Sequence, residues 1–136
     1  MMGRPDTMRL LSEAPETYVH GQFVASLMLA AAYVEHTLME ELERAGVEKK
    51  RMSLELAIEE ARQRKLFAED WLRRADSVRL KRNPFSHLRR PDDPDTLGQR
   101  YMRLSTHPDA LMQADAEEAL ELMYDMFVAT LREATW

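Results

Sequence analysis

Cysteine is absent from the 136 residues, so disulfides, thiol nucleophiles, iron–sulfur clusters and cysteine-based zinc sites are excluded. Only four glycines and six prolines are present, too few for the many tight turns of an all-β domain. No apolar run approaches the length of about 18 to 20 residues that a membrane span needs. The longest, Phe23 to Val34, has 12 residues and contains Ser26. We therefore expect a soluble, cytoplasmic protein.

The residues that are abundant favour helices. The composition is 45% hydrophobic and 32% charged, which is typical of a globular chain, and this length fits one domain with its own core. Alanine, leucine, glutamate, arginine and methionine dominate, and these are good helix formers. We predict an all-α bundle of four to five helices in a single domain over residues 14–136. Residues 1–13 show no sustained apolar period and are expected to form a flexible N-terminus.

Apolar periodicity places the first two helical regions. A helical pattern runs from about Pro15 to Ala45, with Gly21 marking a possible kink or split and Gly46 as a stop signal. Its near-continuous apolar centre predicts that this helix is the central one. Ser53 is a suitable N-cap for the next helix, whose buried face comprises Leu54, Ile58 and Ala61.

The second half of the chain is less regular. Another apolar set follows from Phe67 to Val78, and periodicity leaves open whether it forms a separate helix or continues the previous one. Asn83-Pro84 is expected to end that pattern, because a residue before proline is disfavoured in the α region. Residues 88–107 are rich in turn formers and predict an irregular connection. A last helix is expected from Pro108 to about Thr135. Its predicted buried stripe is Met112, Ala116, Ala119, Leu120, Met123, Phe127 and Leu131.

Charge is distributed unevenly along the chain. Residues 62–90 contain ten arginines and lysines against three acidic residues, a local charge of +7. The whole chain carries −5, so the remainder carries −12. A basic field on an acidic body suits a phosphate-binding face, although a solvated helix surface has the same composition.

The segment that carries chemistry is Arg82-Asn83-Pro84-Phe85-Ser86-His87, at the end of the most basic helix. Arg82 offers a planar fork for a phosphate, and His87 is the side chain type whose proton moves near neutral pH. A base and a cation of this kind are sufficient to cleave RNA without a metal. A base deprotonates the ribose 2′-OH, and a cation stabilises the charge that develops at phosphorus.

Arg-x4-His with Asn directly after the arginine, at the end of a helix in a small all-α domain, resembles the HEPN superfamily (higher eukaryote and prokaryote nucleotide-binding domains). The resemblance covers roughly residues 20–134. It implies a HEPN-like helical bundle, a homodimer whose two motifs form one composite site, and metal-independent endoribonuclease activity on single-stranded or looped RNA. The biological role, whether toxin–antitoxin, defence or RNA processing, stays open, and an antitoxin or regulatory protein is a possible partner. The position two residues after the histidine, often tyrosine in toxins paired with nucleotidyltransferase antitoxins, is Arg89 here.

The resemblance also assigns roles to the motif residues. Arg82 is the phosphate-stabilising cation, His87 the general acid or base, and Asn83 the polar group that orients them. Glu35, on the central helical pattern, is placed to reach the motif and polarise His87. Further contacts to nucleic acid are expected from the polar and basic residues around the motif: Arg79, Lys81, Ser86, Arg89 and Arg90.

Other functions remain open at this point. Many HEPN domains have lost catalysis, so the alternative is an RNA- or nucleotide-binding module or a helical protein-interaction module. Arg82 and His87 also suit a helix C-terminus that simply ends in basic residues. We expect no metal, because no glutamate is followed three residues later by histidine as in bundle di-metal sites. No cofactor is expected either, since phosphate-loop and dinucleotide motifs are absent from the sequence.

Overall fold

A computed structural model describes residues 4–48 and 52–131, which form six helices and no strand. The helices are α1 (Pro5–Val19), α2 (Phe23–Arg44), α3 (Leu54–Gln63), α4 (Glu69–Ser86), α5 (Leu97–Leu104) and α6 (Pro108–Leu131). The expected all-α bundle is confirmed, with six helices in the described ranges instead of four to five. Of these six, none combines the length and hydropathy of a bilayer-crossing helix.

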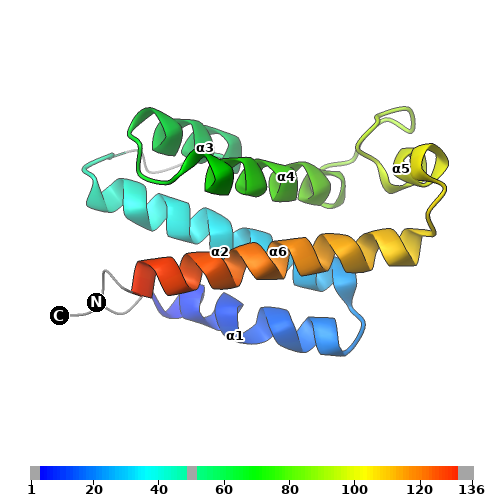
Figure 1. Cartoon of the computed structure of the whole chain (residues 1–136), viewed down its shortest axis with the longest axis horizontal. Coiled ribbons are helices and arrows are strands. Elements are labelled where there is room, and N and C mark those ends of the chain that lie inside the picture. Colours follow the sequence, from blue (N-terminus) through cyan, green and yellow to red (C-terminus); the bar gives the residue numbers. More distant parts are fainter. Residues whose placement is uncertain (1–3, 49–51, 132–136) are drawn as a thin grey trace.

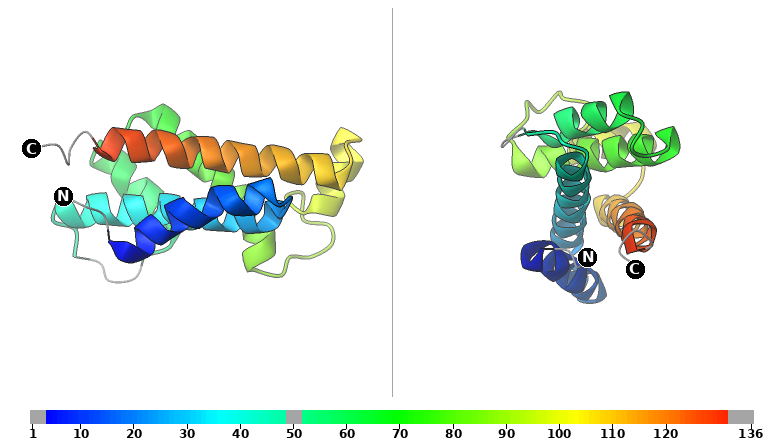
Figure 2. Two further views of the ribbon diagram at one scale, coloured as in Figure 1. Left: turned by 90° about the horizontal axis from the view of Figure 1, so that it is seen from below. Right: turned by 90° about the vertical axis from the view of Figure 1, so that its left-hand side faces the viewer.

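Helix α2 occupies the centre of the bundle (Figures 1 and 2), where it packs against α1, α3, α4 and α6. Its alanines and leucines explain that position, because small and apolar side chains on most sides of a helix allow neighbours on most sides. Leu27, Ala30, Ala31, Val34 and Leu38 are all buried. The prediction of a central helix in this region is confirmed.

The first helical pattern divides at Gly21, as one of the expected alternatives had it. Gly21 has φ +74, and its N–H donates to the Tyr18 carbonyl, while the N–H of Gln22 reaches Thr17. These bonds terminate α1, and glycine accepts the positive φ without strain. Helix α1 begins at Pro5, so the prediction that the first helix starts near Pro15 is wrong, and residues 5–13 are helical. Ala14 anchors the helix in the core despite Pro15 in its interior.

Helices α3 and α4 are separate, which settles the second open alternative. Ser53 accepts a hydrogen bond from the Leu56 N–H, confirming the predicted cap, and Lys65 takes a left-handed conformation where α3 ends. Helix α4 then runs through Pro84 to Ser86, so the prediction that it ends at Asn83-Pro84 is wrong. The N–H of His87 donates to the Asn83 carbonyl at 2.9 Å and closes the last turn. Proline disfavours the α conformation of the preceding residue without forbidding it.

The region expected to be irregular contains α5. Thr96 caps it by accepting a hydrogen bond from the Gln99 N–H. The helix packs on α6 through an ion pair, and Leu97 at its start packs against the core. Arg100 donates Nη1 to Asp115 Oδ2 at 2.6 Å and Nη2 to Oδ1 at 2.8 Å. This hydrogen-bonded carboxylate raises the pKa of Arg100 above its usual range.

Helix α6 buries much of its predicted stripe. Five members are buried, namely Met112, Ala116, Ala119, Leu120 and Met123. Phe127 is half-buried and Leu131 is exposed, while Leu122 and Met126 are buried in their place. The buried face at the C-terminal end of α6 is therefore turned around the helix axis from the predicted one. The expected end near Thr135 lies outside the described residues.

Candidate functional site: the end of helix α4

Arg82 lies on the core-facing side of α4. It follows Ala75 by seven residues and Val78 by four, and both of those side chains are buried. Residues at this spacing share one helix face, so the sequence itself directs Arg82 toward α2 and not into solvent. Its side chain is 17% exposed. The aliphatic stem thus extends the apolar face of α4, and the guanidinium lies where that face meets solvent.

Two neighbours hold the guanidinium. Nη1 donates to Oε2 of Glu35, on α2, at 3.4 Å, and Nη2 donates to Oδ1 of Asn83 at 3.1 Å. Nε is buried and has no partner among the described residues. A guanidinium carries five N–H donors, so these two bonds leave donor capacity for a further anion. The structure therefore brings together three of the predicted residues: Arg82, Asn83 and Glu35.

His87 is positioned differently. It is the residue after the last turn of α4, with an extended backbone (φ −136, ψ 130) and an exposed side chain. No hydrogen bond joins its ring to Arg82 or Glu35 in the described part of the chain. Glu35, which was expected to polarise His87, pairs with Arg82 instead, and the imidazole remains accessible from outside.

The other predicted contact residues on α4 have partners within the protein. Arg79 pairs with Asp76 at 2.8 Å and with Glu55 of α3 at 3.6 Å. Lys81 pairs with Glu118 of α6 at 2.9 Å. Ser86 lies against the sulfur of Met28. These side chains support the packing of α4 on its neighbours.

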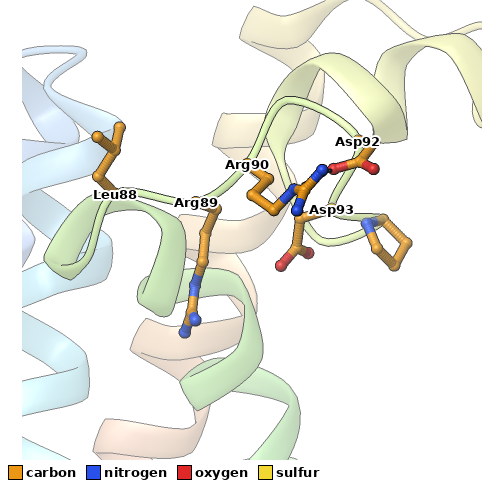
Figure 3. Close-up of a pocket in the computed structure, with 6 residues that line it drawn as sticks. Leu88, Arg89, Arg90, Asp92 and Asp93 are labelled. Carbon is orange, nitrogen blue, oxygen red and sulfur yellow. Dashed lines mark ion pairs between the residues drawn. The ribbon is translucent and has the colours of Figure 1, made fainter.

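Arg89 and Arg90 lie in the exposed loop after α4 (Figure 3). They line an open hollow of about 620 Å³ together with Leu88 and the turn of residues 92–94. Arg90 forms an ion pair with Asp92 at 3.4 Å. The side chain of Arg89 points away from Asp92 and Asp93 in Figure 3, and no carboxylate pairs with it among the described residues.

The basic stretch as a whole is largely neutralised. Within the described ranges, eight of its ten cations form ion pairs with carboxylates, and Lys65 and Arg89 form none. Several of the acids come from distant parts of the chain. Glu118 shows this most clearly, since it accepts hydrogen bonds from both Ser77 and Lys81. Nothing in the local pattern around Glu118 points to that role. The surface is therefore closer to the alternative of a solvated, self-paired helix face than to an open phosphate-binding field.

Three comparisons place the chain against known proteins. No family model, no curated protein and no solved structure matches it.

Proposed function

We propose that the chain is a HEPN-like, metal-independent endoribonuclease that uses Arg82 and His87. One observation carries the proposal. Glu35 and Asn83 hold Arg82 while some of its N–H donors stay unused, and His87, five residues further along the chain, is exposed. A cation fixed beside a titratable group suits a reaction in which negative charge develops on phosphate oxygens while a proton moves.

In the proposed reaction, the 2′-oxygen of a ribose attacks the adjacent phosphorus. One histidine removes the 2′-OH proton, the bond to the 5′-oxygen breaks, and an acid returns a proton to that oxygen. The products are a 2′,3′-cyclic phosphate and a 5′-OH, so atoms and protons balance. Arg82 stabilises the charge on the non-bridging oxygens, and Asn83 orients the guanidinium. Single-stranded or looped RNA is the expected substrate, because its 2′-OH is free to align.

A homodimer suits this chemistry. Among the described residues no hydrogen bond joins His87 to the Arg82 of its own chain. Two histidines, one as base and one as acid, are available when two copies meet. Leu80, Phe85 and Leu88 are exposed apolar side chains at this end of α4. They supply surface that a two-fold contact between copies would cover.

The test measures cleavage of labelled RNA in EDTA and identifies the ends formed. Wild-type protein is expected to form cyclic-phosphate ends, and Arg82→Ala is expected to cut about 10²- to 10³-fold more slowly. Arg73→Ala is the matched control, since Arg73 is exposed on the same helix and, within the described ranges, its one ion pair is with Asp70 at 3.2 Å. A wild-type rate for Arg82→Ala, or an equal loss in both variants, contradicts the role of Arg82.

The alternative is a non-catalytic RNA-binding or protein-interaction module. The ion pairs along α4 favour it, because they leave few free cations for a nucleic-acid backbone. RNA binding without cleavage supports a binding module. Absence of both supports a protein-interaction role.

A further inference from the structure

A groove runs along the second half of α2, on the side where α1 begins. Two hollows, of about 260 and 390 Å³, share Arg4, Met39 and Glu43 as lining residues and so form one continuous depression. The start of α1 and the end of α2 lie in the same half of the molecule in Figure 1. The groove is separate from the loop hollow in Figure 3.

The floor of the groove is apolar. Met39 and Val47 are half-buried, and Leu42 and Met52 form the base where the groove meets the core. Methionine adapts to partners of irregular shape, since its unbranched side chain has three rotatable bonds. A hollow of this size accepts several aliphatic side chains.

The rim is acidic. Asp6, Glu35, Glu40, Glu43 and Glu48 line the two hollows. The cation among the described lining residues, Arg4, is already paired with Glu43 at 2.6 Å, and Glu40 accepts a hydrogen bond from Thr7. An apolar floor between carboxylates is complementary to a segment with apolar side chains on one face and lysine or arginine beside them.

We propose that this groove binds a basic amphipathic helix of a partner protein. Glu35 and Glu43 are eight residues apart on α2, about 12 Å along its axis, which corresponds to roughly two turns of a bound helix. The partner's apolar residues at i, i+3 or i+4, and i+7 enter above Met39 and Val47. Its cations meet Glu43 and Glu48 at the rim.

Glu35 connects the groove to the site on α4. It lines the groove and also holds Arg82 at 3.4 Å. A lysine or arginine of the bound helix competes for that carboxylate, so docking loosens Arg82 and slows RNA cleavage. This consequence rests on the proposed ribonuclease function, whereas docking itself does not.

The test uses a fluorescein-labelled synthetic helix with leucine on one face and lysine on the other. Fluorescence anisotropy is expected to show binding that weakens as salt rises. Glu43→Lys/Glu48→Lys is expected to weaken binding about tenfold at low salt, because two exposed attractions become repulsions. Glu16→Lys/Glu121→Lys changes the net charge equally at exposed positions outside the groove and is expected to bind as wild type.

Further controls separate the possible failures. Val47→Ser, which removes apolar floor, is also expected to weaken binding, and a scrambled peptide of equal charge is expected to bind poorly. Equal loss in both charge-reversal variants means non-specific attraction and overturns the proposal. Binding that appears only after Lys49, Lys50 and Arg51 are replaced by serine also overturns it, since the unaltered chain then does not accept the helix. The peptide is expected to slow RNA cleavage by the wild type. Bound peptide with unchanged cleavage overturns the link through Glu35, and an absence of any cleavage contradicts only the ribonuclease proposal.

Discussion

Two of the arginine–carboxylate pairs that join helices, Arg100–Asp115 and Arg82–Glu35, differ in nearly every physical respect. Arg100 binds Asp115 through two parallel bonds of 2.6 and 2.8 Å, and the Asp115 side chain is 2% exposed. Arg82 reaches Glu35 through a single contact of 3.4 Å, and the Glu35 side chain is 32% exposed. The first pair uses both carboxylate oxygens, whereas the second leaves donors of the guanidinium unused.

The difference separates a cation that holds the fold from one that is available to a ligand. A bidentate pair in the interior has no alternative partner in water, so either charge becomes costly once the other is removed. A partly exposed pair with one contact exchanges more easily for water or for an anion. The comparison therefore predicts opposite consequences when each arginine is removed.

The largest effect is expected from Arg100→Ala. It leaves Asp115 buried without its partner, which typically costs about 3–5 kcal/mol of unfolding free energy. Urea denaturation followed by circular dichroism measures the change. A loss below about 1 kcal/mol would contradict the assignment of a buried structural pair.

A double variant tests the reason for that loss. Arg100→Met with Asp115→Leu removes both charges and keeps apolar volume, and such replacements of buried pairs are often neutral or stabilising. Most of the stability lost in Arg100→Ala is therefore expected to return. Failure to recover it would mean that the pair is required for the packing of α5 itself.

The next effect concerns Glu35 and cleavage. Glu35→Gln keeps a carbonyl acceptor for Arg82 but removes the charge, so the guanidinium is held less firmly. We expect cleavage to fall about tenfold, mainly in kcat, because misplacement of a charge-stabilising group costs transition-state stabilisation. The measurement is single-turnover cleavage of labelled RNA. Glu35→Asp, which retains the charge, is expected to be less impaired than a variant without it. An unchanged rate in Glu35→Gln would remove Glu35 from the site.

The parts of this fold that the sequence predicts are those set by local residue preferences. Ser53 and Gly21 were identifiable because capping and positive φ are local requirements that particular residues meet. The central position of α2 was identifiable from its apolar composition. Such features depend on neighbours in the sequence, so they can be read without knowing the tertiary structure.

Helix α5 was missed for the opposite reason. Its buried contact with α6 is Arg100, a charged residue whose partner lies 15 positions away, and its apolar residues Tyr101 and Leu104 remain half exposed. The predicted start of α1 is too late for two reasons. Thr7 is buried by polar contacts with His36 and Glu40, and Pro15 resembles a helix start. Periodicity detects apolar faces, and both of these faces are partly polar.

The candidate site shows the same division. Arg82, Asn83 and His87 were selected from their spacing, and Glu35 was expected to reach the motif, as it does through Arg82. The neutralisation of Arg79 by Glu55 and of Lys81 by Glu118 was not foreseeable. Those acids are distant in sequence, and a count of charge along the chain does not reveal which charges meet in space.

The smallest effect, and the sharpest test of the comparison, is the stability of Arg82→Ala. Loss of the Arg82 side chain leaves Glu35 in contact with water, which replaces the guanidinium. The unfolding free energy is therefore expected to fall by less than about 1 kcal/mol.

A double-mutant cycle with Glu35→Ala isolates the pair from the packing of the arginine stem, which lies against the buried face of α4. The coupling energy is expected to be a few tenths of a kcal/mol, on the order found for exposed pairs, and to shrink as salt rises. The corresponding cycle for Arg100 and Asp115 is expected to give a coupling several times larger and almost insensitive to salt, because the low-dielectric interior screens little. Equal couplings for the two pairs would mean that Arg82 is as firmly committed to the fold as Arg100, and its availability to a phosphate would lose its physical basis.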